Sequence, residues 1–176
     1  MAEEKKESWL NYLALTTVLF AVCATLATLK GGGFSTRSVM HQSQSSDQWA
    51  YYQAKSIKGY LYELQKEKLE LESRPMKGGP LRADYEKRAE AYGQKIKRYD
   101  DEKADIKKKA EELEKLRDDA QRHSGSFGMA AMFLQIAILL SSIAALMKQK
   151  YFWYIGMASG AGGLIYFANG FLLFMQ

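Results

Sequence analysis

The sequence predicts an all-α membrane protein with three transmembrane helices and a long antiparallel coiled-coil hairpin inserted between the first and the second. Three observations lead to this fold class: three long stretches without charge, a seven-residue repeat of apolar positions, and a short segment rich in proline and glycine that divides the repeat. Charged residues make up 26% of the chain, but they lie almost entirely outside the three stretches. The average composition of the chain resembles that of a soluble domain, although the chain contains segments long and apolar enough to span a membrane.

The uncharged stretches cover residues 8–29, 124–147 and 151–176, and each exceeds the roughly 20 residues that cross a bilayer as a helix. We predict an amino-terminal tail at residues 1–8 and transmembrane helices at residues 9–29, 127–147 and 151–175. The first apolar stretch is longer than the core of a secretion signal and its flank is not clearly basic, so we interpret it as an uncleaved anchor.

The hydrophilic segment at residues 46–122 contains two runs of apolar positions at alternating steps of four and three, which is the pattern of a coiled-coil seam. The predicted seam of the first arm is Ala50, Ala54, Ile57, Leu61, Leu64, Lys68 and Leu71. That of the second arm is Tyr85, Ala89, Tyr92, Ile96, Tyr99, Lys103, Ile106, Ala110, Leu113, Arg117 and Ala120.

A turn at residues 75–80 separates the two arms, because Pro75 cannot continue a helix and Pro80 suits the first turn of the next. Folding the chain there pairs Leu61 with Ile96 and Leu64 with Tyr92. Two amphipathic helices of a larger bundle remain the alternative interpretation.

Glycine-rich segments flank the hairpin on its membrane side. Residues 31–33 are all glycine and are expected to end the first helix, so that residues 30–45 form a flexible collar. Gly125 and Gly128 are expected to interrupt the second arm in the same way. The hairpin is therefore predicted to be hinged at both points where it meets the membrane.

Two groups of residues are candidates for contacts between subunits. Gly156, Gly160 and Gly163 form a stripe of small residues, which lets helices approach closely in lipid, either within one subunit or between two. Trp49, Tyr52 and Tyr60 are expected on exposed sides of the first arm, where clustered aromatic side chains indicate a contact surface. The alternative for the aromatic group is that the collar covers it.

The sequence contains no pattern that indicates catalysis. The apolar stretches carry no ionisable group for an ion or proton path, and the chain has neither a phosphate-binding loop nor a nucleophile with its base. His41 and His123 lack companions at metal-ligand spacing. We therefore expect no enzyme, no cofactor, no metal and no small-molecule substrate, and the charges of both signs along the hairpin do not favour nucleic acid.

The short basic turn at residues 148–150 and Lys5 and Lys6 of the tail favour the cytoplasmic side for both segments. This orientation places the hairpin in the periplasm. Lys30, Arg37, Arg117 and Arg122 near the membrane ends of the hairpin argue for the opposite orientation.

The run DQWAYYQAKSIK at residues 47–58, preceded by WLNY at residues 9–12, resembles an uncharacterised family of bacterial inner-membrane proteins known only as a domain of unknown function. The resemblance covers most of the chain. It implies a bacterial source and three spans with a helical insertion, and it implies no activity.

The leading functional hypothesis is a non-enzymatic homo-oligomer in the lipid bilayer, acting as a scaffold or organiser of the bacterial inner membrane. The alternative is an oligomeric channel or a transport accessory subunit whose pore lies between subunits. An efflux-type periplasmic adaptor is a weaker third hypothesis, because such proteins flank their hairpin with β-rich domains for which this chain has no room.

Overall fold

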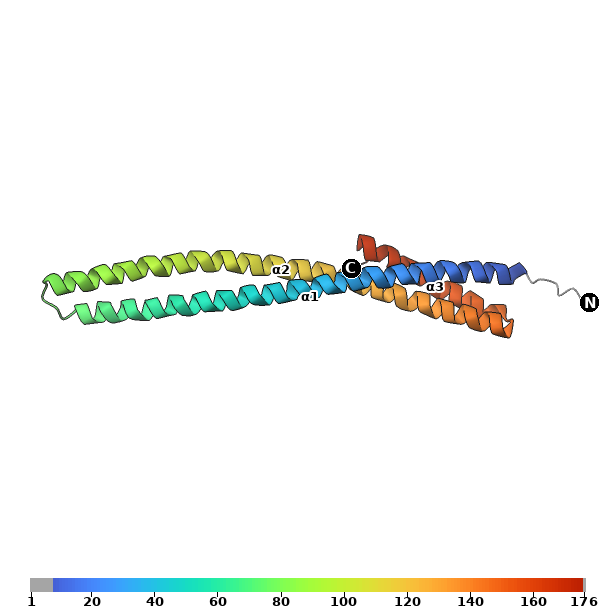
Figure 1. The fold of residues 1–176 in the computed structure, drawn as a ribbon, viewed down its shortest axis with the longest axis horizontal. Helices are drawn as coiled ribbons and strands as arrows, with labels where there is room; N and C mark the ends of the chain where they lie inside the picture. Colours follow the sequence, from blue (N-terminus) through green and yellow to red (C-terminus); the bar gives the residue numbers. More distant parts are fainter. Residues whose placement is uncertain (1–7, 176) are drawn as a thin grey trace, which may run out of the picture. The chain divides into compact units, whose positions relative to one another are not determined.

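A computed structural model describes residues 8–175, which form three helices (Figure 1). They are α1 (Ser8–Ser73), α2 (Pro80–Met147) and α3 (Lys150–Leu172). No strand occurs among these residues, so the all-α class is confirmed. The tail predicted at residues 1–8 lies outside the described residues, except for Ser8 at the start of α1. The helices belong to two compact units: residues 40–116, called the hairpin unit here, and the rest of the described chain, called the apolar unit.

The predicted breaks at the glycine-rich segments do not occur, because α1 continues through residues 31–33 and α2 continues through Gly125 and Gly128. A glycine inside a helix costs about 1 kcal/mol relative to alanine, an amount that packing against a neighbouring helix readily offsets. Gly31 is buried, and a Cβ atom added to it would lie 3.0 Å from Cβ of Phe127. Gly31 therefore permits close approach of α1 to α2, and the helix continues through the exposed Gly32 and Gly33.

The apolar unit is a bundle of three helices built around three clusters of buried side chains. All three helices contain a stretch long and apolar enough to cross a membrane, which indicates a membrane protein. The clusters are centred on Trp9 and Ala144, on Phe20 and Leu134, and on Ala27 and Phe127. Each cluster combines α1 with α2, and side chains of α3 pack against all three.

The ends of α3 are defined by backbone hydrogen bonds. The turn before it has Lys148 at a positive φ of 50°, and the N–H of Gln149 donates to the carbonyl of Ala144 (3.2 Å). At the other end Leu173 adopts the left-handed conformation, and its N–H donates to the carbonyl of Asn169 (2.8 Å). The helix thus ends at Leu172, three residues before the predicted end of the third span.

In the hairpin unit, α1 and α2 run antiparallel and side by side on either side of the turn at residues 74–79 (Figure 1). Gly78 and Gly79 both have positive φ angles, of 108° and 112°, which residues with a side chain rarely adopt. The guanidinium of Arg82 donates to the carbonyl of Met76 (3.1 Å) and ties the turn to the start of α2. The predicted turn at residues 75–80 is therefore close to the observed one.

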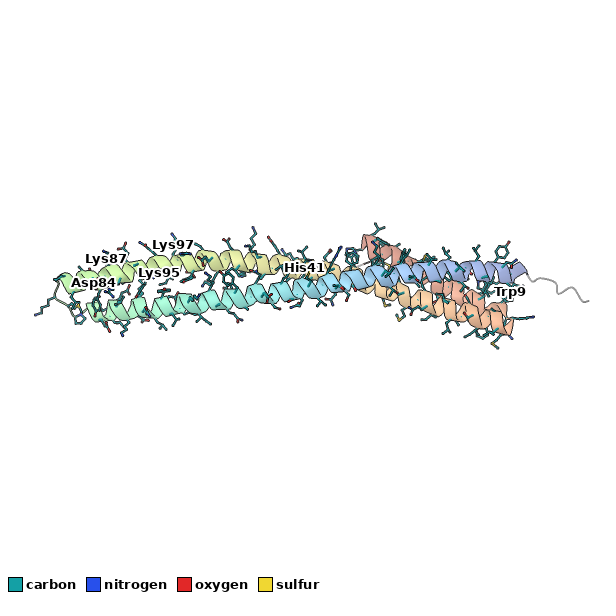
Figure 2. The ribbon with its side chains drawn as sticks, in the orientation of Figure 1. Trp9, His41, Asp84, Lys87, Lys95 and Lys97 are labelled. Atoms are coloured by element: carbon teal, nitrogen blue, oxygen red, sulfur yellow. The ribbon has the colours of Figure 1, made fainter. Side chains whose placement is uncertain are left out.

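The inner face of the second arm is the one that the seven-residue repeat predicts. Every predicted seam position from Tyr85 to Leu113 is buried or partly buried, with Ala89, Ile106 and Ala110 among the least exposed side chains of the chain. Lys87 and Lys97, which lie off this seam, are exposed on the outer side of α2 (Figure 2). The prediction of the inner face of this arm is confirmed.

The inner face of the first arm is not the predicted one. Ile57, Leu61, Leu64 and Leu71 are 60%, 54%, 63% and 51% exposed. The partly or fully buried positions are instead Ser45, Gln48, Trp49, Tyr52, Lys55, Ser56, Gly59, Tyr62, Lys66, Leu69 and Ser73. The buried row is shifted by two residues from the predicted seam. Two residues correspond to a rotation of about 200° around the helix axis, so the predicted seam faces away from α2.

The lengthwise alignment of the arms nevertheless agrees with the prediction to within about one turn. The Tyr62 ring lies 5.4 Å from the ring of Tyr92 and 5.8 Å from that of Tyr99, and Ser45 donates to the carbonyl of Ala110 (3.4 Å). The predicted pairing placed Leu61 beside Ile96, which lies between the two tyrosines that Tyr62 contacts. The alignment was thus predicted, and the rotation of the first arm was wrong.

A cysteine pair tests this rotation. A Cβ atom at Gly59 would lie 4.0 Å from Cβ of Tyr99, within the range of native disulfides. In a Cys23→Ala background, Gly59→Cys with Tyr99→Cys should oxidise to an intramolecular disulfide, seen as faster migration in a non-reducing gel. The predicted seam pair, Leu64→Cys with Tyr92→Cys, should stay reduced within the chain, and the opposite preference would show that the leucines face α2.

Candidate functional surfaces

Trp49 and Tyr52, expected on an exposed face, lie against the second arm. The indole N–H of Trp49 donates to Oε1 of Glu114 (2.8 Å), and the rings of Trp49 and Tyr52 meet edge to face at 5.7 Å. Both side chains are partly buried by the hairpin itself. The second arm covers them, and not the collar that the alternative interpretation proposed. They are therefore contacts within the subunit.

Tyr60 remains on the outside of the hairpin, with 59% of its surface exposed. Its ring lies 5.9 Å from the ammonium of Lys103, which approaches it as a cation approaches an aromatic face. Of the three aromatic candidates, Tyr60 is therefore the most exposed.

The interior of the hairpin contains charged and aromatic groups where a leucine seam was expected. Lys55 pairs with Glu102, and Arg98 donates to the other oxygen of the same carboxylate (2.8 Å). The hydrogen bond from Lys55, reinforced by that from Arg98, lowers the pKa of Glu102, and the hydrogen bond to Glu102 raises the pKa of Lys55. The ammonium of Lys95 lies 4.8 Å from the Tyr62 ring. These contacts join the arms without using the leucines.

The predicted seam of the first arm, called the leucine stripe below, forms a continuous exposed row on the hairpin unit. It consists of Ala50, Ala54, Ile57, Leu61, Leu64, Lys68 and Leu71, and all seven residues are exposed. Its members keep the alternating steps of four and three. Contiguous apolar surface outside a membrane-spanning segment is typical of an interaction site.

The three glycines named as candidates for contacts between subunits lie against other helices of the same chain. A Cβ atom at Gly160 would lie 2.2 Å from Cζ of Phe20, and one at Gly163 would lie 2.7 Å from Cγ of Leu134. One at Gly156 would lie 3.2 Å from the carbonyl oxygen of Ala137. The glycine stripe therefore brings α3 against α1 and α2 within the subunit, which is one of the two uses that the sequence left open.

Several polar side chains of the apolar unit form hydrogen bonds between its helices, whereas the buried hydroxyl of Ser141 has no hydrogen-bond partner among the described residues. The indole of Trp153 donates to the hydroxyl of Thr16 (3.2 Å), and the hydroxyl of Ser159 donates to the carbonyl of Phe133 (2.9 Å). The imidazole Nδ1 of His123 lies 2.8 Å from the carbonyl oxygen of Gly170, and its ring stacks on Phe34. Such bonds join the helices of the bundle.

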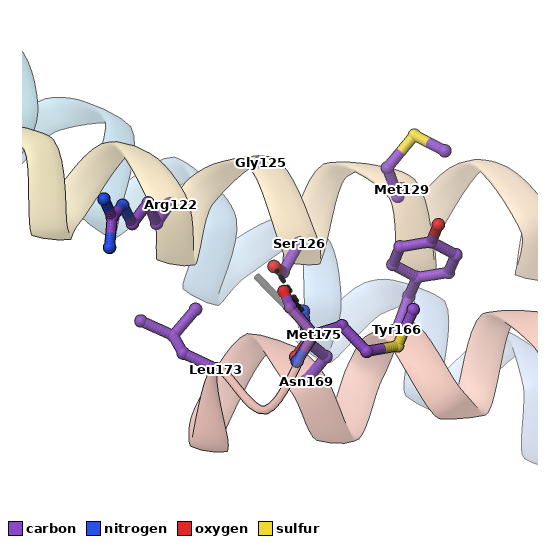
Figure 3. Close-up of a pocket in the computed structure, with 8 residues that line it drawn as sticks. All are labelled: Arg122, Gly125, Ser126, Met129, Tyr166, Asn169, Leu173 and Met175. Carbon is purple, nitrogen blue, oxygen red and sulfur yellow. Dashed lines mark hydrogen bonds between the residues drawn. The ribbon is translucent and has the colours of Figure 1, made fainter.

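A cavity of about 400 Å³ lies between α2 and α3 in the apolar unit (Figure 3). Its walls are Arg122, Gly125, Ser126, Met129, Tyr166, Asn169, Leu173 and Met175. The Asn169 amide donates to Ser126 (2.9 Å) and accepts from the N–H of Met175 (2.7 Å), so it holds the residues after α3 in place. Arg122 is the single charged residue of this lining.

Metal-ligating side chains do not gather in groups of three or more among residues 8–175. His41 and His123 therefore belong to no such group among the described residues.

Comparison with known families places the chain in one of them. The model of the family described as Domain of unknown function (DUF4337) matches residues 9–173. No curated protein and no solved structure matches the chain. The match includes nearly all of α1 and the whole of α2 and α3. The chain therefore belongs to this family of proteins with a domain of unknown function.

Proposed function

We propose that this chain is a non-enzymatic, homo-oligomeric membrane protein that acts as a scaffold or organiser of the bacterial inner membrane. In this proposal the hairpin unit is an antiparallel coiled coil that joins subunits outside the bilayer, and the apolar unit anchors each subunit in the lipid.

The observation that carries the proposal is the leucine stripe. Four large aliphatic side chains in it are each more than half exposed, on a segment whose other exposed positions are mostly charged or polar. Exposed rows of this kind on soluble segments are assembly surfaces, because water does not tolerate large contiguous apolar patches. A scaffold that assembles through its hairpin would bury the leucine stripe between subunits.

The particle mass tests the proposal. Light scattering of the protein in mild detergent, corrected for bound detergent, should give a protein mass that is a multiple of the chain mass. A particle with the mass of one chain at micromolar concentration would contradict the homo-oligomer.

An oligomeric channel or transport accessory subunit remains the second candidate, since a pore between subunits needs the same assembly. The polar groups of the apolar unit favour the scaffold, because Thr16, Ser159 and Asn169 are engaged in bonds between helices of one subunit. Reconstituted protein should therefore show no ion conductance above that of empty bilayers. A reproducible single-channel current would favour the channel.

For orientation, we propose that the amino terminus is cytoplasmic and the hairpin periplasmic, based on the basic turn at residues 148–150. A cysteine in the hairpin tests this in a Cys23→Ala background. Ser43 is exposed and suits the purpose, whereas Ser45 is buried against Ala110. Ser43→Cys should react with a membrane-impermeant maleimide in cells whose outer membrane alone is permeabilised. Labelling only after the inner membrane is opened would place the hairpin in the cytoplasm.

A further inference from the structure

The leucine stripe keeps a coiled-coil pattern although no helix of its own subunit covers it within the described residues. We infer that a second copy of this chain covers it, with the first arms of the two copies parallel and in register. The inference rests on the proposed homo-oligomer and names the surface that forms it.

The spacing of the stripe specifies a helix as the partner. Steps of four and three keep one side of a helix in contact with another helix that winds around it with a left-handed twist. In this repeat Ala54, Leu61 and Lys68 are first-position (a) residues, and Ala50, Ile57, Leu64 and Leu71 are fourth-position (d) residues. A lipid surface or an extended peptide would not require the alternation to continue along the whole arm.

The residues beside the stripe permit two identical copies to meet. Within α1 one flanking position is basic, Lys58, and two are acidic, Glu67 and Glu72, so each chain brings a single excess charge to the contact. The remaining flanking residues are uncharged: Tyr51, Gln53, Tyr60 and Gln65. The outer face of the second arm, in contrast, is dominated by lysine and carboxylate side chains, which would leave charges against the leucines of the stripe. The same stripe of another copy is the better partner.

The membrane favours the parallel arrangement. In every copy the first arm follows the apolar stretch of α1 along the chain, so copies that share one bilayer and one orientation begin their first arms on the same side of the membrane. A symmetric pair of parallel arms then places each stripe residue beside its own counterpart, and Leu61, Leu64 and Leu71 stack in successive layers.

Lys68 gives this pairing its register. A single lysine at a first position of the repeat is tolerated in two-stranded coiled coils, where it selects register and strand number at the expense of affinity. The Lys68 side chain is 73% exposed, and its ammonium lies 3.8 Å from Oε1 of Glu72. Its methylenes can therefore cover the partner while its charge stays in water beside a carboxylate.

Disulfide trapping tests the contact in the full-length protein in detergent, with Cys23→Ala as background. Leu64→Cys should form a disulfide between two chains on mild oxidation. Glu63 is the neighbouring residue and is equally accessible to oxidant, but it lies outside the leucine stripe. Glu63→Cys is therefore the matched control and should form no disulfide between chains. Dimers that form only when Leu61→Cys chains are mixed with Leu64→Cys chains would indicate antiparallel arms and overturn the inference.

Affinity variants provide the second measurement. Leu61→Glu with Leu64→Glu should raise the dissociation constant of the particle at least about tenfold, because two central apolar contacts are replaced by charges. Leu116→Glu changes an equally exposed leucine of the same unit outside the stripe and should leave the mass unchanged. Lys68→Leu should tighten the association.

These results separate the inference from the function on which it rests. A wild-type particle of oligomeric mass without a disulfide at Leu64, and with no effect of the two glutamates, would overturn the stripe as the contact and leave the homo-oligomer standing. A wild-type protein with the mass of one chain would overturn both.

Discussion

Gly160→Leu is expected to lower the free energy of unfolding of the apolar unit by about 3 kcal/mol, at the upper end of what overpacking in a core typically costs. The reason is the contact between α3 and α1. The ring of Phe20 lies directly over Gly160, where an added Cβ would be within 2.7 Å of three ring atoms. Phe20 is 3% exposed and packs with Ala24, Leu134 and Ala137, so its ring has no free space to enter.

The matched control is Gly162→Leu on the same helix. A Cβ atom at Gly162 would have no heavy atom within 4 Å, so this variant should unfold at nearly the wild-type temperature. Thermal unfolding followed by circular dichroism in detergent compares the two. Adding Phe20→Ala to Gly160→Leu should recover part of the lost stability, because the smaller side chain vacates the space that leucine needs.

Gly160→Leu also separates a contact within the subunit from one between subunits. If Gly160 packed against another copy, Gly160→Leu would separate the subunits and lower the mass of the particle. The unfolding temperature of the variant would then no longer depend on protein concentration. If Gly160 packs against Phe20 of the same chain, the unfolding temperature of the variant falls. The particle mass stays that of the wild type, because the leucine stripe is unchanged. Equal effects of Gly160→Leu and Gly162→Leu would contradict the packing of α3 against Phe20.

The sequence was sufficient to predict the helices and the second arm because the relevant signals are local. Uncharged stretches longer than a bilayer crossing identify the apolar helices, and Gly78 with Gly79 between two prolines identifies the turn. The second arm has one row of apolar and aromatic residues amid charges, so its inner face was unambiguous. A single periodic row on a helix can be assigned without knowing its partner.

The first arm carries two rows with the same period, and sequence periodicity cannot choose between them. The row with the leucines is predicted from its alternating steps of four and three, whereas α2 packs against the row that contains Tyr52, Gly59 and Tyr62. The choice depends on the shape of the partner: Gly59 gives room to Tyr99, and Tyr62 packs against Tyr92 and Tyr99. Gly59 was the available signal, since a residue without a side chain leaves room for the ring of Tyr99.

The glycines of the apolar unit illustrate a related ambiguity. Residues 31–33 were expected to end a helix because glycine is a weak helix former in isolation. In the bundle, the missing side chain of Gly31 lets α1 approach Phe127 of α2. This role depends on the partner helix and cannot be read from the glycine run alone. The same ambiguity explains why Trp49 and Tyr52 were predicted on an exposed face. In the structure the first arm has the opposite face toward α2, and both residues lie on that face.

Phe127→Ala is expected to destabilise the apolar unit by about 3–5 kcal/mol, the range found for removal of a buried aromatic ring. Phe127 has no exposed surface. Its ring lies 4.9 Å from the ring of Phe171, and a Cβ atom at Gly170 would lie 2.7 Å from its Cδ1. Because Phe34 of α1 stacks on the same ring at 6.0 Å, all three helices meet at this ring, and alanine would leave a cavity between them.

Leu139→Ala is the control for Phe127→Ala, because Leu139 lies on the same helix with 59% of its surface exposed and should contribute little to packing. Phe127→Leu should fall between the two, since leucine refills part of the volume. The three variants are compared by thermal unfolding in one detergent at one protein concentration, so that mass action does not enter the comparison. A Phe127→Ala protein as stable as Leu139→Ala would mean that the ring does not join the three helices, and the continuous path of α1 past residues 31–33 would then lack its packing partner.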